Sequence, residues 1–387
     1  MKILYISTPA YADCDFPLIK SYQEKGIDVT YIITIGPFNR KSTLININNP
    51  KLKTGIYSAN ELPELAIYGN YMDLSKVFVS YRTGRNIFSP STWIENDKLR
   101  RFVNKFEFDI IHTDEYYRGL RNWIYQTGAK IIVSYHDPFP HSGEHFKNEV
   151  TIYNHVIKNS HGAVLLNERQ LPEFCKFYHI APENVLINKL GVYDNIRSFV
   201  KTLPEKGPKK NLLFFGRISP YKGVEYLCEA MIKVHKVLPD VTLTIAGSGS
   251  LYFDFKPYKD LEYIALKNHY VDMEELANLL SLSDITVCPY TDATQSGVIM
   301  TSYSLGKPVI ATNVGGLPEM VEQAKTGLLV APRDSNALAE AIIKMYSDDT
   351  YLCQMSDYIL SEYYNGEKSW PSIADKYIAY YNKILSE

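Results

Sequence analysis

The sequence has 387 residues, too many for one ordinary core and enough for two domains of about 150 to 200 residues each. Its residues are 45% hydrophobic and 22% charged, and the net charge is -2. This composition is typical of a soluble globular protein and excludes the strong basic field of a nucleic-acid-binding domain. No apolar run reaches the roughly 20 residues that a membrane-spanning helix needs. The five cysteines lack metal or redox spacing, which predicts reduced thiols in a cytoplasmic protein.

Short apolar runs alternate with helix-like segments along the whole chain. In chain order, strands are expected at residues 2–7, 28–33, 109–113, 130–136, 162–167, 184–188, 211–216, 241–247, 261–265, 285–290, 308–312 and 327–331. Buried strands that alternate with helices favour parallel sheets covered on both faces. The two sets of strands predict an α/β fold of two Rossmann-like, doubly wound domains. Residues 36–100 are less regular, and we expect long loops there with a hairpin or short helices.

The stretch VKTLPEKGPKKN at residues 200–211 separates the two sets of strands. It is rich in Pro, Gly and Lys and has no apolar period, which is typical of a linker. We therefore predict an N-terminal domain at residues 1–205 and a C-terminal domain at residues 206–365.

The sharpest local pattern is FFGRISPYKGVEYL in the second half. A buried strand runs into Gly216, where the backbone can turn closely, then Arg217, and Lys222 follows just before a helix. Ligands of doubly wound sheets bind at the carboxyl ends of strands, and free N–H groups at a helix start favour an anion. Arg grips phosphate oxygens in a bidentate way and Lys acts as a point charge. The pattern favours a diphosphate clamp; the alternative is an ordinary exposed loop.

A second pattern, ITVCPYTDATQSGVIM, also passes from a strand end into a helix. Gln295 offers two donors and an acceptor, and the backbone amides of Ser296, Gly297 and Val298 are placed to donate to a phosphate or a sugar hydroxyl. The alternative is an ordinary helix capped by a serine. On this pattern alone, the ordinary capped helix is favoured.

The first half offers His136, at the end of the strand in IIVSYHDPFPHSGEH. A histidine at the carboxyl end of a strand faces the ligand edge of the sheet. His141, Glu144 and His145 follow it, but their spacing differs from the HExxH zinc helix, so we expect no metal.

Several other chemistries lack their motifs. Ser7-Thr8-Pro9-Ala10 stands where a dinucleotide-binding GxGxxG would follow the first strand. The chain also lacks the phosphate-binding GxxxxGK[ST] and the nucleophile elbow GxSxG. No Asp-x-Asp pair at a strand end would hold a divalent ion.

Taken together, GRISPYKG, SDITVCPY, GKPVIATNVGGLPEMV and TGLLV resemble the retaining glycosyltransferases of family 4, which have the GT-B fold. HDPFP, NSHGAVLLNE and NKLGVYDNIRSF fit the same order. The resemblance covers the chain from about residue 109 to its end. It implies two Rossmann-like domains facing across a cleft, with the tail, about residues 366–387, crossing back to pack on the first domain.

The resemblance also implies roles for single residues. Arg217 and Lys222 match the pair that holds the donor diphosphate and stabilises it as it leaves. His136 matches a first-domain histidine near the donor sugar. The turn at Gly247 and the segment ending at Val271 match regions around the nucleotide base. No metal or cofactor is implied, because the nucleotide-sugar is a substrate.

One departure from the family lies in ATQSGVIMTSYS. The family usually carries two glutamates, for the donor sugar and the ribose, at the places of Ala293 and Thr301. Gln295 and the amides up to Val298 remain placed to contact sugar and phosphates, together with Thr301. We interpret the stretch as a variant site.

The resemblance implies a glycosyltransferase that moves a hexose-type sugar from a nucleotide-sugar to a glycan or lipid-linked acceptor, with retention of configuration. Surface polysaccharide or glycolipid biosynthesis, and peripheral contact with the inner face of a membrane, are the expected setting. Two alternatives stay open: a GT-B sugar-nucleotide epimerase, and a non-catalytic nucleotide-sugar-binding protein.

Overall fold

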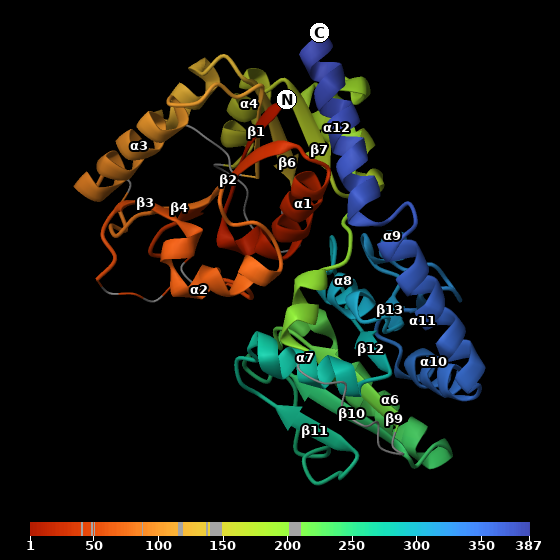
Figure 1. Cartoon of the computed structure of the whole chain (residues 1–387). Helices are drawn as coiled ribbons and strands as arrows, with labels where there is room; N and C mark the ends of the chain where they lie inside the picture. The colour runs from red at the N-terminus through yellow and green to blue at the C-terminus, as the bar shows by residue number, and fades with distance from the viewer. Residues whose placement is uncertain are drawn as a thin grey trace. The chain divides into compact units, whose positions relative to one another are not determined.

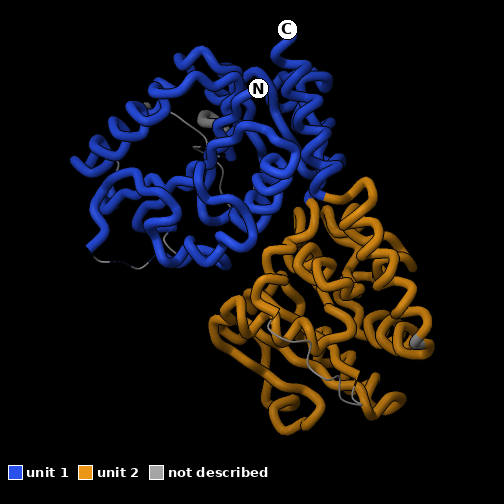
Figure 2. The backbone as a smooth tube through the Cα atoms, viewed as in Figure 1, with its two compact units in different colours: residues 1–190, 370–387 blue, residues 191–369 orange. Residues whose placement is uncertain are grey.

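The computed structural model describes the chain except for residues 40–41, 48, 50, 87, 115–118, 137, 140–148 and 201–209. The protein forms two compact units (Figure 2): an N-terminal unit of Met1–Leu190 with Trp370–Glu387, and a C-terminal unit of Gly191–Ser369. The boundary predicted at residue 205 lies outside the described residues. The chain passes between the units at Leu190–Gly191 and again at Ser369–Trp370, where the sequence places the crossing tail from about residue 366.

The N-terminal unit is built on an eight-stranded sheet in the order β3-β4-β2-β1-β5-β6-β7-β8 (Figure 1). Its strands are β1 (Lys2–Ser7), β2 (Asp28–Ile35), β3 (Gly55–Ser58), β4 (Val77–Tyr81), β5 (Ile110–Thr113), β6 (Lys130–Tyr135), β7 (Gly162–Leu165) and β8 (Val185–Ile187). All neighbours pair in parallel except β3, which runs antiparallel to β4 at the edge. The central strands are buried along nearly their whole length, as parallel strands covered on both faces must be.

The helices of this unit are α1 (Ala12–Glu24), α2 (Pro63–Ala66), α3 (Pro90–Val103), α4 (Glu149–Asn159), α5 (Leu171–Tyr178) and α12 (Trp370–Ser386). Residues 36–100 thus hold more regular structure than the sequence indicated. They form β3, β4, the short α2 and most of the 14-residue α3.

The C-terminal helix α12 packs on the N-terminal unit through tyrosine hydroxyls. The hydroxyl of Tyr381 lies 2.9 Å from that of Tyr22 on α1 and 2.5 Å from Nδ1 of the buried His112. Tyr380 donates to the carbonyl of Asn184 over 2.7 Å. These contacts give several of the chain's 31 tyrosines a structural role, because a buried hydroxyl needs a partner.

The C-terminal unit has a fully parallel six-stranded sheet in the order β11-β10-β9-β12-β13-β14. Its strands are β9 (Lys210–Phe215), β10 (Val241–Ala246), β11 (Ile264–Lys267), β12 (Ile285–Cys288), β13 (Val309–Thr312) and β14 (Gly327–Val330). Its helices are α6 (Val224–Val237), α7 (Met273–Leu282), α8 (Gly297–Ser304), α9 (Leu317–Met320), α10 (Ser335–Tyr346) and α11 (Asp349–Tyr364). The prediction of two parallel-sheet α/β domains is confirmed. Across the described residues, no helix is both long and apolar enough to cross a membrane.

Candidate functional site

The loops that follow β9, β10, β12 and β13 meet at one edge of the C-terminal sheet, because these strands are parallel neighbours. Two glycines let them approach backbone to backbone. Gly223 has a φ of 64°, and a Cβ there would lie 2.0 Å from the carbonyl oxygen of Pro289. Gly315 has a φ of 48°, and a Cβ there would lie 1.6 Å from the carbonyl oxygen of Ala293. Only glycine fits such positions, so this edge is a tightly packed platform.

Two cations stand on this platform. Arg217 follows β9 and is exposed, and Lys222 ends a 3₁₀ turn just before α6. The ammonium of Lys222 lies 3.6 Å from the ring centroid of Tyr290 and 5.0 Å from that of Tyr221. In the described part of the chain, neither cation has an ion-pair partner. Burial, and then the charge of Arg217, lower the pKa of Lys222 to about 8. An anion would relieve both effects.

The start of α8 lies beside these cations. A Cβ built on Gly216 would lie 3.7 Å from a methyl group of Val298. The hydroxyl of the buried Ser296 lies 3.3 Å from that of Tyr290, whose ring carries Lys222. The N–H groups of Gly297 and Val298 are the first of the helix and have no acceptor within it. The sequence-predicted residues from both motifs are thus brought together.

Other predicted donor-binding residues are placed differently. The amide of Ser296 is already used, because it points to the sulfur of Met320 at 3.3 Å. Thr301 is buried, and its hydroxyl donates to the carbonyl of Gly297 over 2.9 Å. Gln295 is half-buried just before the helix. These roles stay predictions.

The predicted base region lies in the loops after β10 and β11. Gly247 packs on the Arg217 loop, since a Cβ there would lie 1.8 Å from the carbonyl oxygen of Gly216. Gly249 and Asn268 join the two loops through a pair of hydrogen bonds of 3.1 and 3.0 Å. Val271 is half-buried before α7.

Sequence reasoning gave no role to two residues of this edge. The ring of Tyr290 lies under the ammonium of Lys222. Its position two residues after the end of β12, at the ligand edge of the sheet, was a signal for this role. Ser219 lies between the two cations in sequence, and its buried hydroxyl has no hydrogen-bond partner among the described residues. A bound anion would supply an acceptor for it.

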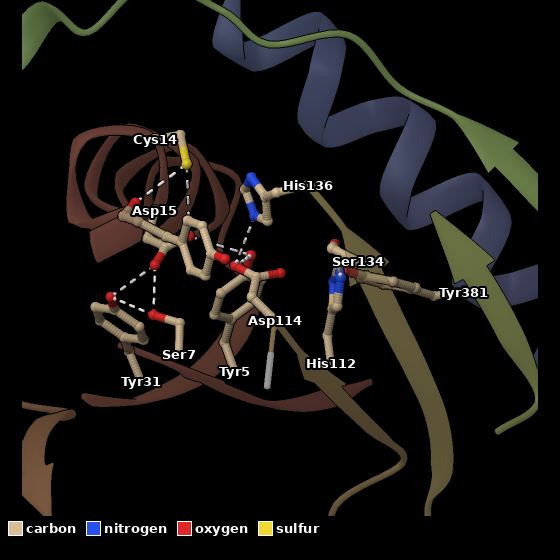
Figure 3. A network of polar contacts seen from close by, with 11 residues as sticks. Tyr5, Ser7, Cys14, Asp15, Tyr31, His112, Asp114, Ser134, His136 and Tyr381 are labelled. Carbon is tan, nitrogen blue, oxygen red and sulfur yellow. Dashed lines mark hydrogen bonds and ion pairs between the residues drawn. The ribbon is translucent and has the colours of Figure 1, made fainter. Parts of the chain in front are cut away.

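His136 lies in the N-terminal unit, directly after β6, and only 7% of its surface is exposed. Its ring stacks on Tyr11 with a centroid distance of 3.8 Å and an interplanar angle of 10°. Its Nε2 lies 3.5 Å from a carboxylate oxygen of Asp114. Figure 3 shows this histidine within a buried network of polar side chains. The possible metal ligands His141, Glu144 and His145 lie outside the described residues.

The fold and this edge define an α/β protein of two Rossmann-like units, with two cations, Arg217 and Lys222, on the sheet edge of the second. Residues 209–348 match the model of the family described as Glycosyl transferases group 1, which confirms the resemblance carried by the sequence motifs. The chain is 32% identical over 154 residues to glycogen synthase of Mycobacterium tuberculosis, a segment that covers 39% of this chain and 37% of that protein.

Two solved structures show the same fold along the chain. Anabaena Alr3699/HepE in complex with UDP has a TM-score of 0.67 and 16% identity, and covers 99% of this chain and 100% of that one. The UDP-GlcNAc 2-epimerase from Neisseria meningitidis bound to UDP-GlcNAc has a TM-score of 0.60 and 14% identity, with coverage of 99% and 100%.

Proposed function

We propose that the protein is a glycosyltransferase that transfers a hexose-type sugar from a nucleotide-sugar to a carbohydrate or lipid-linked acceptor, with retention of anomeric configuration. Two cations, Arg217 and Lys222, carry this proposal, because neither has a carboxylate partner among the described residues. They stand where free helix amides also favour an anion. A nucleoside diphosphate is the anion that the family match on residues 209–348 supports.

The chemistry follows from charge. When the bond between sugar and diphosphate breaks, negative charge grows on the leaving oxygen. Arg217 and Lys222 stabilise that charge, and a preorganised donor set contributes most where water is excluded. The acceptor oxygen bonds to the anomeric carbon on the face that the diphosphate leaves, and its proton passes to the leaving oxygen. Configuration is thereby retained without the pair of carboxylates that glycosidases use. The proposed reaction needs no metal ion, because the two side chains supply the positive charge.

A second candidate is a sugar-nucleotide epimerase, which the fold shared with the Neisseria enzyme favours. A third is a protein that binds a nucleotide-sugar without turnover, which the neutral residues Ala293 and Thr301 favour. Only the first candidate, the transferase, needs an acceptor. For it we propose a role in surface polysaccharide or glycolipid synthesis, in the cytoplasm and in peripheral contact with the membrane.

One experiment separates the three candidates. The protein is screened by thermal shift against UDP, GDP, ADP and dTDP, because a ligand that binds only the folded state raises the melting temperature. The sugar donors of the nucleotide that binds are then incubated with and without acceptors. Slow donor hydrolysis and faster transfer support the transferase. Inversion at C2 of the sugar supports the epimerase, and binding without turnover with every acceptor supports the third candidate.

A further inference from the structure

Four buried side chains form a chain of contacts at the carboxyl edge of the N-terminal sheet (Figure 3). The hydroxyl of Tyr5 on β1 lies 3.2 Å from Oδ1 of Asp15 on α1 and 3.1 Å from Oδ2 of Asp114, which follows β5. The same oxygen of Asp114 lies 3.5 Å from Nε2 of His136, which follows β6. Asp15, Asp114 and Tyr5 are each at most 3% exposed.

The two carboxyl groups differ in what surrounds them. Asp15 is surrounded by hydroxyl groups, since its Oδ2 accepts from Ser7 and, over 2.9 Å, from Tyr31. Asp114 faces the imidazole of His136 instead. Two carboxylates that share one buried hydroxyl cannot both be ionised at low cost, so one of them holds a proton, and the one next to the imidazole is ionised.

The number of protons decides which group donates in each hydrogen bond between these side chains. The hydroxyl of Tyr5 has one proton and cannot donate to both acids. A protonated Asp15 donates to Tyr5, and Tyr5 donates to Asp114, so each of these two hydrogen bonds has its own proton. Burial and the charge of Asp114 raise the pKa of Asp15 well above its usual value. Although burial opposes it, the hydrogen bond and charge of His136 hold the pKa of Asp114 below its usual value.

We propose that Asp114 is a positioning residue for His136, held in place by a protonated Asp15 through Tyr5. The carboxylate of Asp114 lies 3.5 Å from Nε2 of His136 and favours the tautomer with a proton on that nitrogen. Nδ1 is then the nitrogen that accepts a hydrogen bond from a sugar hydroxyl of the substrate. The functional part of this inference rests on the proposed glycosyl transfer, whereas the placement of the protons does not.

Two further features indicate that, of these four side chains, only His136 contacts the substrate. Stacking on Tyr11 fixes the plane of the imidazole. The cavity beside the chain, lined among others by Tyr5, Asp15 and Asn188, has a volume of about 10 Å³. That is room for about one water molecule and not for a sugar ring. Asp15 therefore acts on the substrate only through Asp114 and the imidazole.

The ring nitrogens of His136 test the proton assignment directly. In protein labelled with ¹⁵N-histidine, with the His136 signals assigned by His136→Gln, long-range NMR spectra distinguish the two tautomers. We expect a proton on Nε2 in the native protein and in Asp15→Asn, where an amide N–H replaces the acid proton toward Tyr5. In Asp114→Asn the amide presents its own N–H to the ring, which shifts the proton to Nδ1. A proton on Nδ1 in the native protein, or an unchanged ring in Asp114→Asn, overturns the proposal.

Turnover tests the functional part. Asp114→Asn is expected to lower kcat about 100-fold, because a misplaced imidazole no longer aligns the substrate, with an unchanged dissociation constant for the nucleotide. The matched control is Asp97→Asn, the same substitution at a carboxylate on α3 that is 40% exposed, which is expected to keep the native kcat. Equal loss in both variants overturns the positioning role. If the native protein turns over no donor, the proposed function is wrong. The NMR measurement of the His136 tautomer still tests the placement of the protons in that case.

Discussion

Lys222 combines features that suit an anion site and little else. Its ammonium lies over the ring of Tyr290, which favours a cation. Burial and the nearby Arg217 nonetheless make its charge costly, and the pKa falls to about 8. A structural lysine would be expected to have a carboxylate partner, and in the described chain Lys222 has none. These features support the proposal that an anionic ligand neutralises the charge of Lys222.

The affinity for a nucleoside diphosphate is predicted to fall as the pH rises through about 8. Below that pH, Lys222 is charged in the free protein; above it, the proton is lost. A bound diphosphate favours the charged form and raises this pKa, so the dissociation constant rises up to about tenfold per pH unit until the pKa of the complex is reached. Calorimetric titration with UDP, or with the nucleotide found in the screen, between pH 6 and pH 10 measures this.

The matched control is Lys222→Arg, which keeps a charge at this position at every pH of the titration. Its affinity is expected to stay flat above pH 8. If the native protein and Lys222→Arg lose affinity in parallel, another group is responsible for the pH dependence.

At the residue scale, the sequence motifs indicated which residues lie near one another at this edge. They did not indicate which hydrogen bonds each residue makes. The structure places Val298 beside Gly216 and Lys222 near Arg217, while their roles in binding stay predictions. The amide of Ser296, however, is taken by the sulfur of Met320, 24 residues further along. Such a contact depends on how two loops fold over each other, and no local spacing contains it.

The loops of the C-terminal sheet edge act as one element because their backbones touch. Gly315→Ala is predicted to destabilise the protein by about 3 kcal/mol or more and to weaken nucleotide binding, since the Cβ would collide with the carbonyl of Ala293. Gly26→Ala is the matched control: its φ of 71° is equally unsuited to alanine, but nothing lies within 4 Å. It should cost about 1 to 2 kcal/mol and leave binding unchanged. Thermal unfolding and calorimetry measure both effects, and equal losses would contradict the collision.

The C-terminal helix is fixed by hydroxyl groups as well as by apolar packing. Tyr381→Phe leaves the hydroxyl of Tyr22 and Nδ1 of His112 without this partner in a buried place, which should cost about 1 to 3 kcal/mol. Tyr57→Phe removes an exposed hydroxyl that donates to Lys53 over 2.7 Å, and should cost no more than about 0.5 kcal/mol. Denaturant unfolding followed by tyrosine fluorescence compares the two; a similar small cost in both would show that the buried hydroxyls contribute little.

At the scale of the whole molecule, both sheets could be predicted because their strands are short, apolar and regularly spaced. Residues 36–100 could not. β4 pairs in parallel with β2, almost fifty residues earlier, and that pairing leaves no local period. The tail was predicted from family resemblance, and its tyrosine contacts come from residues more than 190 positions apart. The fold of residues 36–100 and the packing of the tail thus depend on long-range contacts, which local sequence patterns do not contain.

The central claim is that Arg217 and Lys222 stabilise a leaving diphosphate. Single-turnover release of the nucleoside diphosphate from the active donor tests it most directly, in the native protein, Arg217→Ala, Lys222→Ala and the control Lys236→Ala, which changes an exposed residue at the end of α6. The account predicts that each site variant loses about 3 to 4 kcal/mol of transition-state stabilisation, a rate loss of about 10² to 10³, while Lys236→Ala keeps the native rate. Near-native rates in both Arg217→Ala and Lys222→Ala would contradict it.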